Sequence, residues 1–291
     1  MAEAVAGNGY ALPARVPGYT PGGIPFAYPP LGFYLLAPLL DTGVSPLALA
    51  RVLPGVFTIV ALMPTYALGR ALLGSNGQAG FAAVIVTSSP AVLTWHLSAG
   101  GVVHTFAFFL TVCGLYTGYR LFVDSRRWAL PTAVLFGLVV LTRPLYSVLF
   151  GSGTLYFYLA RDRSLRGLAY GTLVALGEFV LALPWWLTVL FQHGLSVFAG
   201  TAGSRLGIGQ GLLWFPINFG YLPATRFLAL WHVLVFLGVL YFLARRRYFL
   251  VGWFAFTALV YPEPRFLLFV GAFLASAFLF EGFLPMLTGS A

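Results

Sequence analysis

Long apolar segments separated by short polar stretches run along almost the whole chain. They fall at about residues 47–73, 80–97, 101–122, 128–142, 144–160, 167–191, 226–244, 247–261 and 266–284. About 20 apolar residues in a helix span the hydrocarbon core of a bilayer, and helices keep their backbone polar groups paired within lipid. The pattern therefore predicts an all-α, polytopic integral membrane protein with about nine transmembrane helices.

The composition agrees with this prediction, since 60% of the 291 residues are hydrophobic and 8% are charged. Soluble domains carry about 25% charged residues. A net charge of +9 would suit a nucleic-acid partner, but all 16 basic residues are arginines in short clusters between apolar segments. That is the positive-inside pattern of membrane proteins, so no nucleic-acid partner is expected. The single cysteine, Cys113, lies in an apolar segment and predicts neither a disulfide nor a thiolate metal site.

The arginines predict the orientation of the helices. Ten of them would lie on one side of the membrane: Arg70, Arg120, Arg126, Arg127, Arg161, Arg163, Arg166, Arg245, Arg246 and Arg247. The other six are Arg15, Arg51, Arg143, Arg205, Arg226 and Arg265. Because basic residues are enriched in cytoplasmic connections, the side with ten arginines is predicted to be cytoplasmic. The opposite, extracytoplasmic face is then the face where chemistry is expected.

Residues 128–160 form either one long crossing or two short ones. Arginine clusters flank both ends of this stretch, so a single crossing would leave one cluster outside. Two crossings that turn at Arg143–Pro144 keep both clusters inside, each about 24 Å long at ~1.5 Å per residue. We therefore predict a helical hairpin here.

The chain reads as a single transmembrane domain over residues 1–291, with an external loop and interfacial helix at 1–46 and a long external loop at 192–225. The segment 10–23 is rich in proline, glycine and aromatic residues, which predicts an ordered loop. A helix is expected to begin near Pro30, because proline suits the first helical turn. An external 1–46 segment has no hydrophobic segment before it here, which predicts a further transmembrane helix upstream of residue 1.

Four short motifs, in order and spacing, resemble the GT-C superfamily of integral-membrane glycosyltransferases, in particular the branch of protein O-mannosyltransferases and aminoarabinose transferases. They are Tyr28-Pro29-Pro30-Leu31, Leu141-Thr142-Arg143-Pro144, Leu183-Pro184-Trp185-Trp186 followed by His193-Gly194, and Arg265-Phe266-Leu267-Leu268. Each motif alone is weak, and their joint order over some 240 residues carries the resemblance. The resemblance implies transfer of a sugar from a polyprenyl-phosphate donor to a protein, lipid or glycan acceptor on the extracytoplasmic face.

The chain departs from this family in its acidic residues. Members carry an acidic pair in the first external loop, whereas the only acid before Tyr28 here is Glu3. An acid common at the start of a later helix is also missing, since Gly100-Gly101-Val102-Val103-His104 stands there. The resemblance then implies a chain that lacks its amino-terminal helix and acidic motif, and it leaves open whether the chain is active in this form.

Transfer of this kind needs positive charge at the departing phosphate and a base near the acceptor. Arg265 and Arg143 are the first candidates for the donor phosphate, because a guanidinium binds phosphate bidentately. The alternative for both is contact with lipid headgroups. For Arg265 a second alternative is an ion pair with Glu263. Arg205, in a glycine-rich loop, is a third candidate, with a mobile cover over the cavity as its alternative. Glu263 is a weak candidate for the base.

Several further residues are expected to line the substrate cavity. They are Tyr28, Pro29, Pro30, His104, His193 and Glu178. Glu178 is included because an acid inside a span is costly and usually functional, although a protonated glutamate bonded to a neighbouring helix explains it equally. His96 and His104 flank one predicted turn and read as interfacial histidines or as metal ligands without a carboxylate partner. No cofactor follows from the sequence, and a divalent cation stays open.

Two other functions compete with the glycosyltransferase interpretation. A transporter or lipid flippase predicts paired charges inside the membrane and an internal repeat with broken helices, whereas one isolated acid and no clear repeat are found. A non-catalytic fragment or scaffold would account for the missing acids.

Overall fold

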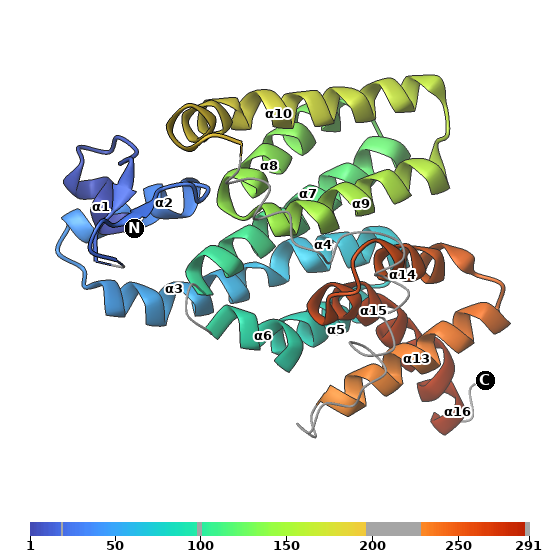
Figure 1. The fold of residues 1–291 in the computed structure, drawn as a ribbon. Coiled ribbons are helices and arrows are strands. Elements are labelled where there is room, and N and C mark those ends of the chain that lie inside the picture. Colours follow the sequence, from blue (N-terminus) through green and yellow to red (C-terminus); the bar gives the residue numbers. More distant parts are fainter. Residues whose placement is uncertain (19, 98–100, 196–227, 289–291) are drawn as a thin grey trace.

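A computed structural model describes residues 1–288 except 19, 98–100 and 196–227. Most of the described chain is helical (Figure 1). In order, its elements are α1 (Ala2–Gly7), β1 (Arg15–Val16), β2 (Ile24–Pro25), α2 (Leu31–Asp41), α3 (Pro46–Val60), α4 (Leu62–Leu73), α5 (Asn76–Ser88), α6 (Pro90–Leu97), α7 (Gly101–Val123), η1 (Arg126–Trp128), α8 (Ala129–Thr142), α9 (Pro144–Arg161), α10 (Leu165–His193), α13 (Leu228–Ala244), α14 (Tyr248–Val260), α15 (Pro264–Phe278), η3 (Leu279–Phe283) and α16 (Leu284–Thr288).

Several of the described helices have a serine cap or a proline at their start. The side chains of Ser45, Ser75 and Ser164 accept amide hydrogens at the starts of α3, α5 and α10. A serine at this position satisfies one of the amides that has no partner within the helix. Pro144 and Pro264 open α9 and α15, where a missing amide hydrogen costs nothing. These start signals explain why the helix positions agree closely with the apolar segments of the sequence.

Helices α7 and α15 form the centre of the bundle, and most residues of both are buried. Helix α13 packs on α15 through two glycines. A Cβ atom at Gly238 would lie 2.6 Å from the backbone of Leu274, and one at Gly271 would lie 2.6 Å from the Val235 side chain. Small residues let helices approach this closely, which is how membrane helices gain packing contacts without a hydrophobic effect.

The first 41 residues form a small unit beside the bundle, at the left in Figure 1. Its core consists of Val5, Val16, Phe26 and Ala37. The structure corrects the sequence interpretation of this region, because the expected loop contains β1, which pairs antiparallel with β2, and α1 was not predicted. Two-residue strands and a six-residue helix carry too little periodicity to be detected in a sequence. The predicted helix after Pro30 is confirmed as α2.

Among the described residues, four helices are long and apolar enough to cross a membrane: Pro46–Leu73, Gly101–Val123, Leu165–His193 and Pro264–Thr288. The pair α5 and α6 makes a fifth if it is one span, bent by 47°. At ~1.5 Å per residue, α8 and α14 are only about 20 Å long, less than the hydrocarbon core of about 30 Å. The count of nine crossings therefore stays a prediction, while a multi-helix membrane protein is supported.

Helices α8 and α9 are separate and meet at Arg143, as the sequence predicted. Arg143 has extended backbone angles, φ −158° and ψ 102°, which interrupt the helix before Pro144. Phe136 and Phe150, each seven positions from Arg143, stack with ring centroids 4.6 Å apart. Contact between positions at equal distance from the break shows that the two helices run antiparallel.

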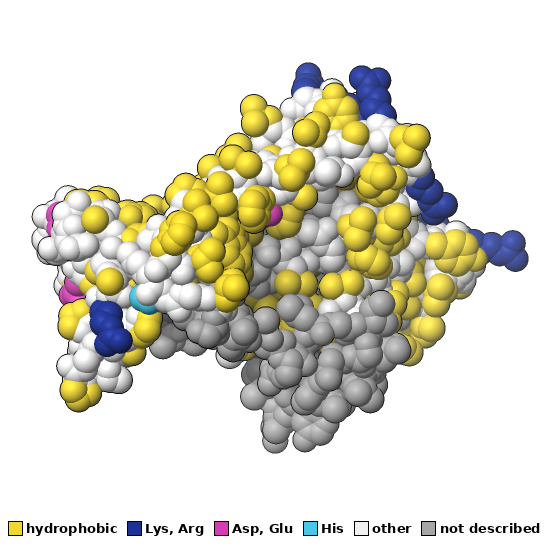
Figure 2. Space-filling model, turned by 45° about the horizontal axis from the view of Figure 1, so that its top comes forward, with side chains coloured by type: hydrophobic (Ala, Val, Ile, Leu, Met, Phe, Trp, Pro, Cys, Tyr) yellow, Lys and Arg dark blue, Asp and Glu magenta, His cyan; other side chains and the backbone are white. Residues whose placement is uncertain are grey.

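The helix bundle has two chemically different ends. The arginine-rich end comprises the turns that carry Arg70, Arg120, Arg126, Arg127, Arg161, Arg163, Arg166 and Arg245–Arg247. Contacts join these turns, since Arg126 pairs with Asp162 and the guanidinium of Arg161 lies 3.9 Å from the Phe249 ring. Figure 2 shows most of the arginine side chains along one edge, with broad apolar surface between them and the opposite end. We call the opposite end, where α7, α9 and α15 begin, the site end.

Helix α15 continues into a π-helical turn, η3, that carries Glu281. One carboxylate oxygen of Glu281 accepts a hydrogen bond from the Gln78 amide at 2.9 Å, and the other pairs with Arg247. The hydroxyl of Ser276 donates to the backbone carbonyl of Gln78 at 2.7 Å. Glu281 thereby ties α5, the turn before α14 and the end of α15 together.

Candidate functional site

Arg265 lies in the first turn of α15 and is buried at the site end. Its side chain is 3% exposed, and its Nε lies 3.6 Å from Oε1 of Glu263, which is 12% exposed. The guanidinium carbon lies 4.4 Å from the ring centroid of Trp95 and 5.0 Å from that of Tyr146. An ion pair and two aromatic faces compensate the cost of burying this charge.

His104 and Tyr146 complete the surroundings of Arg265. Nη1 of Arg265 donates to the Tyr146 hydroxyl at 3.2 Å and lies 3.3 Å from Nδ1 of His104. Arginine has donors only, so Nδ1 of His104 must be the unprotonated nitrogen in this contact. The Arg265 guanidinium therefore sets the tautomer of His104 and the direction of the Tyr146 hydroxyl.

Arg143 and Tyr28 form a second polar contact at the same end. Nη1 of Arg143 donates to the Tyr28 hydroxyl, and the guanidinium carbon lies 5.9 Å from the Tyr28 ring centroid. Tyr28 comes from the segment between β2 and α2, and Ala27 packs beside Val140 of α8 and Trp185 of α10. The interruption of the helix at Arg143 places its side chain at the mouth of the bundle, where it is half-buried.

The two arginines act on common neighbours. Both guanidinium groups lie close enough to His104 and Tyr146 to interact with them electrostatically. Tyr28, Arg143, His104, Tyr146 and Arg265 therefore form one group, which we call the arginine–tyrosine cluster. It joins the amino-terminal unit, the α8–α9 turn and the starts of α7 and α15. Four of its five members are residues that the sequence predicted for the donor phosphate or the substrate cavity, and those roles stay predictions.

His96 lies next to this cluster and is 1% exposed. The hydroxyl of Thr58 donates to the carbonyl of Pro54 at 2.7 Å, so its oxygen accepts from Nδ1 of His96 at 2.9 Å. In that tautomer Nε2 carries a lone pair, and this buried atom has no hydrogen-bond partner among the described residues. Thr58 thus fixes the orientation of His96, and the Nε2 atom of His96 accepts no hydrogen bond from the described residues.

Pro29 and Pro30 are buried beneath Tyr28 rather than presented to an open space. The next turn packs on α7, since a Cβ at Gly32 would lie 3.0 Å from Val103. Proline fixes its own φ and restricts the residue before it. In the structure, the two prolines hold Tyr28 against Arg143, and their predicted place in the cavity lining stays a prediction.

The structure does not bring Glu178 into the arginine–tyrosine cluster. It is half-buried in α10, about 10 Å along the helix from Trp185, and has no hydrogen bond or ion pair among the described residues. His193 is the last residue of α10 and is half-buried. Its role in binding substrate stays a prediction. Arg205 lies outside the described residues.

A cavity of about 210 Å³ lies beside the cluster, between α1, α2, α3 and the start of α7. Its wall includes Glu3, Phe33, Leu49 and Val102. Glu3 is the only acid that precedes Tyr28 in the sequence. Within the described part of the chain, no group of three or more His, Cys, Asp or Glu side chains is placed to hold a metal ion.

Sequence reasoning missed Tyr146, Trp95 and Thr58. Tyrosine, tryptophan and threonine in apolar helices resemble ordinary core or interface residues, so nothing in the pattern distinguishes Trp95 and Thr58. One usable signal was the position of Tyr146, which follows the Arg143–Pro144 break within the first turn of α9. A tyrosine hydroxyl that deep needs a partner, and Arg265 provides it.

Comparison with solved structures adds the architecture. The archaeal oligosaccharyltransferase AglB from Archaeoglobus fulgidus, in complex with an inhibitory peptide and a dolichol-phosphate, matches with a TM-score of 0.55 and 16% sequence identity. The match covers 99% of this chain and 47% of that chain. This chain has the GT-C fold. The predicted GT-C resemblance, made from four short motifs, is confirmed at the level of fold.

A second GT-C structure gives the same result. An Archaeoglobus fulgidus oligosaccharyltransferase in complex with Zn and sulfate matches with a TM-score of 0.55 and 18% identity, over 99% of this chain and 46% of that chain. The chain thus spans about half the length of these two proteins. No family model matches its sequence, and no curated protein sequence matches it.

Proposed function

We propose that this GT-C chain binds a polyprenyl-phosphate-linked sugar at its site end and serves as the membrane part of a glycosyltransferase. The convergence of Arg143, Arg265, His104 and Tyr28 at one end of a GT-C bundle carries the proposal. One of the two similar structures holds a dolichol-phosphate, which belongs to the same chemical class of carrier lipid.

Arg143 is the proposed ligand of the donor phosphate. It is half-buried at the mouth of the bundle, and Tyr28 engages only its Nη1. A guanidinium has five N–H donors, so most remain for an incoming phosphate. Charge-assisted contacts of this kind are short, directional and roughly twice as strong as neutral ones.

Arg265 fits the role of a positioning residue better than that of a direct phosphate ligand. With 3% of its side chain exposed, it lies behind Trp95, His104 and Tyr146. Its charge adds to the positive potential that an anionic headgroup meets at this end. It also holds the rings of His104 and Tyr146 through contacts with its Nη1.

Glu263 is the proposed general base for the acceptor. It directly precedes α15, its side chain is 12% exposed, and its Oε1 lies 3.6 Å from Nε of Arg265. Glu3, on the wall of the neighbouring cavity, is the alternative carboxylate. We place the reaction on the extracytoplasmic face, because the arginine-rich end suits the cytoplasmic side. A peptide is the first acceptor to test, since one similar structure holds an inhibitory peptide.

The test measures donor binding before transfer, so that it does not depend on the acceptor. The purified chain in lipid nanodiscs is titrated with dolichyl phosphate and with a dolichyl-phosphate-linked sugar. We expect Arg143→Gln to weaken binding of both about tenfold or more, because one charge-assisted contact is worth about 1.5–3 kcal/mol. The matched control, Arg127→Gln at the arginine-rich end, should bind as the unchanged protein does.

A labelled donor then tests the reaction. Loss of label from the lipid, to peptide or to water, supports a transferase, and Glu263→Gln should abolish it without changing donor binding. Equal donor binding by Arg143→Gln and Arg127→Gln would refute the site. Movement of the labelled lipid between leaflets without release of label would instead support a flippase. Binding of the donor with neither movement nor release would support a non-catalytic carrier-lipid module.

A further inference from the structure

An apolar groove near the arginine-rich end is separate from the site described above. It has a volume of about 360 Å³ and lies between α7, α8, α9 and α10. Phe122, Phe136 and Leu155 contribute to its wall, together with a stripe of α10 that includes Leu168 and Gly171. From Leu168 to Ala175 this stripe extends for about 10 Å along the helix.

The groove opens on the lipid-facing surface. Leu155 and Leu168 are 49% and 48% exposed, so its edges are not covered by another helix of the described chain. Its glycines make it wide, since a Cβ at Gly171 would meet nothing closer than Phe122 at 3.8 Å. In a membrane protein, an apolar groove that opens to lipid is suited to bind a hydrocarbon chain.

A cation lies at one end of the groove. The Nε of Arg163 donates to the carbonyl of Leu159, which places this guanidinium over the last turn of α9. Leu159 lies one helical turn from Leu155 on the groove wall, and both are exposed on the same face. The terminal nitrogens of Arg163 have no hydrogen bond or ion pair among the described residues, and Arg166 follows in the first turn of α10.

We propose that this groove binds an anionic phospholipid, with one acyl chain between α9 and α10 and the phosphate on Arg163. A guanidinium with two free nitrogens matches a phosphate, and arginines at this level of a membrane are attracted to anionic headgroups. The donor lipid is not the proposed occupant. Arg163 and Arg143 lie at opposite ends of α9, about 27 Å apart along its axis.

The experiment compares lipids on the full chain by native mass spectrometry from detergent. Phosphatidylglycerol and phosphatidylcholine with the same acyl chains are titrated in parallel. We expect phosphatidylglycerol to bind more tightly, and Arg163→Gln to weaken it about tenfold while leaving phosphatidylcholine unchanged. Gly171→Leu fills the groove and should weaken both lipids.

Two control variants match these changes. Arg127→Gln removes an exposed arginine at the same end, and Gly80→Leu adds a side chain to a helical glycine with open space around it. Both should bind phosphatidylglycerol as the unchanged protein does. Gly171→Ala, whose Cβ has ordinary contact with Phe122, replaces Gly171→Leu if the larger residue lowers the unfolding temperature.

Four outcomes would overturn the proposal. The first is that Arg163→Gln and Gly171→Leu both bind phosphatidylglycerol as the unchanged protein does, and the second is that the unchanged protein binds the two lipids equally. The third is that dolichyl phosphate displaces phosphatidylglycerol. The fourth is that Gly171→Leu converts a dimer of the chain to a monomer. The last result would show that a second copy of this chain covers the groove. None of these outcomes affects donor binding at Arg143, so the two proposals fail separately.

Discussion

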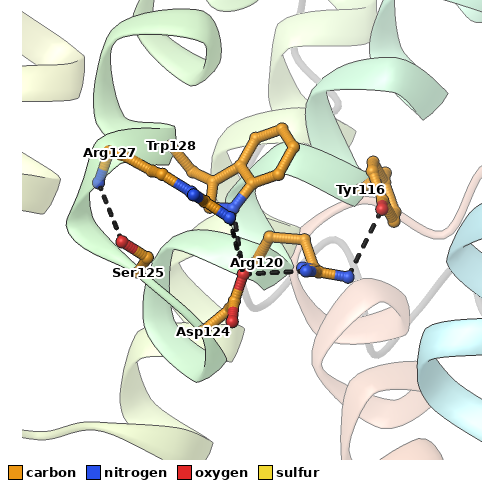
Figure 3. Close-up of polar contacts among 6 residues, drawn as sticks. All are labelled: Tyr116, Arg120, Asp124, Ser125, Arg127 and Trp128. Carbon is orange, nitrogen blue, oxygen red and sulfur yellow. Dashed lines mark hydrogen bonds and ion pairs between the residues drawn. The ribbon is translucent and has the colours of Figure 1, made fainter.

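Arginine occupies contrasting environments at the two ends of this bundle. At the arginine-rich end, Arg120 and Arg127 share the carboxylate of Asp124, and their side chains are 33% and 73% exposed (Figure 3). At the site end, the Arg265 side chain is 3% exposed and is held by Glu263, a histidine and aromatic rings. Exposed arginines orient a membrane protein at little cost, whereas a buried one needs a set of partners that only a specific fold supplies.

The largest difference between the two ends is expected in the loss of stability when an arginine is removed. We expect Arg265→Ala to lower the free energy of unfolding by about 3 kcal/mol or more, because Glu263 would lose the cation that compensates its burial. Arg127→Ala should change it by less than about 0.5 kcal/mol. Denaturant unfolding of both variants in the same detergent measures this, and equal effects would contradict the contrast.

The Arg143–Tyr28 contact tests the mouth of the site end. Tyr28→Phe removes the hydroxyl that accepts from Arg143 and should cost about 1 kcal/mol of unfolding free energy. Tyr248→Phe is a suitable control, because Tyr248 is 59% exposed at the arginine-rich end. If the two substitutions lower the unfolding temperature equally, the contact contributes nothing to stability.

Acid should weaken the arginine-rich end through Asp162. Hydrogen bonds from Ser164 and from Arg126 hold the pKa of Asp162 below its ordinary value of 3.8. Its stabilisation is therefore present above pH 3.8 and is lost as the pH falls through the lower, folded-state pKa. Asp162→Asn should remove about 1 kcal/mol near neutral pH and flatten the loss of thermal stability below about pH 4. If the thermal stability of Asp162→Asn falls below pH 4 as steeply as that of the unchanged protein, other carboxylates cause the loss of stability in acid.

Salt should produce the smallest effect. The pKa of Asp124 is lowered chiefly by its hydrogen bond from Arg120 and then by that from Trp128 (Figure 3). The side chain of Asp124 is open to solvent. Asp124→Asn should lower the unfolding temperature slightly in dilute buffer and leave it unchanged at about 1 M salt, because screening removes the interaction of exposed charges. Thermal unfolding at the two salt concentrations checks this, and Arg265→Ala in the same buffers should show no such dependence.

Much of the helix layout was predictable, because apolar length and the serines and prolines at helix starts are local signals. The break at Arg143–Pro144 is the clearest case, since charge placement and proline chemistry agreed on it. The amino-terminal unit was not predictable, as its strands and first helix depend on contacts with α2 rather than on their own periodicity. The number of crossings depends on tilt and on partner helices, which the pattern does not contain.

Which candidate residues lie close together was predictable, but their burial was not. The sequence placed Tyr28, Arg143, His104 and Arg265 on one predicted face, from the arginine distribution and from the motifs that resemble the GT-C superfamily. That Arg265 lies behind aromatic rings while Arg143 stands at the mouth depends on side-chain packing between distant segments. Glu178 was the opposite case. The sequence reveals an acid within a predicted membrane span, but it does not reveal how far that acid lies from the site.

The π-helical turn that carries Glu281 makes this corner of the molecule sensitive to chain length. A π turn contains one residue more than an α turn, so deleting a single residue there would restore regular winding and rotate the following residues by about 100°. Substitutions are absorbed by neighbouring atoms, but such a rotation displaces a whole side chain. Loss of one codon at residue 279 or 280 would therefore rotate Glu281 and detach Gln78 and Arg247 together.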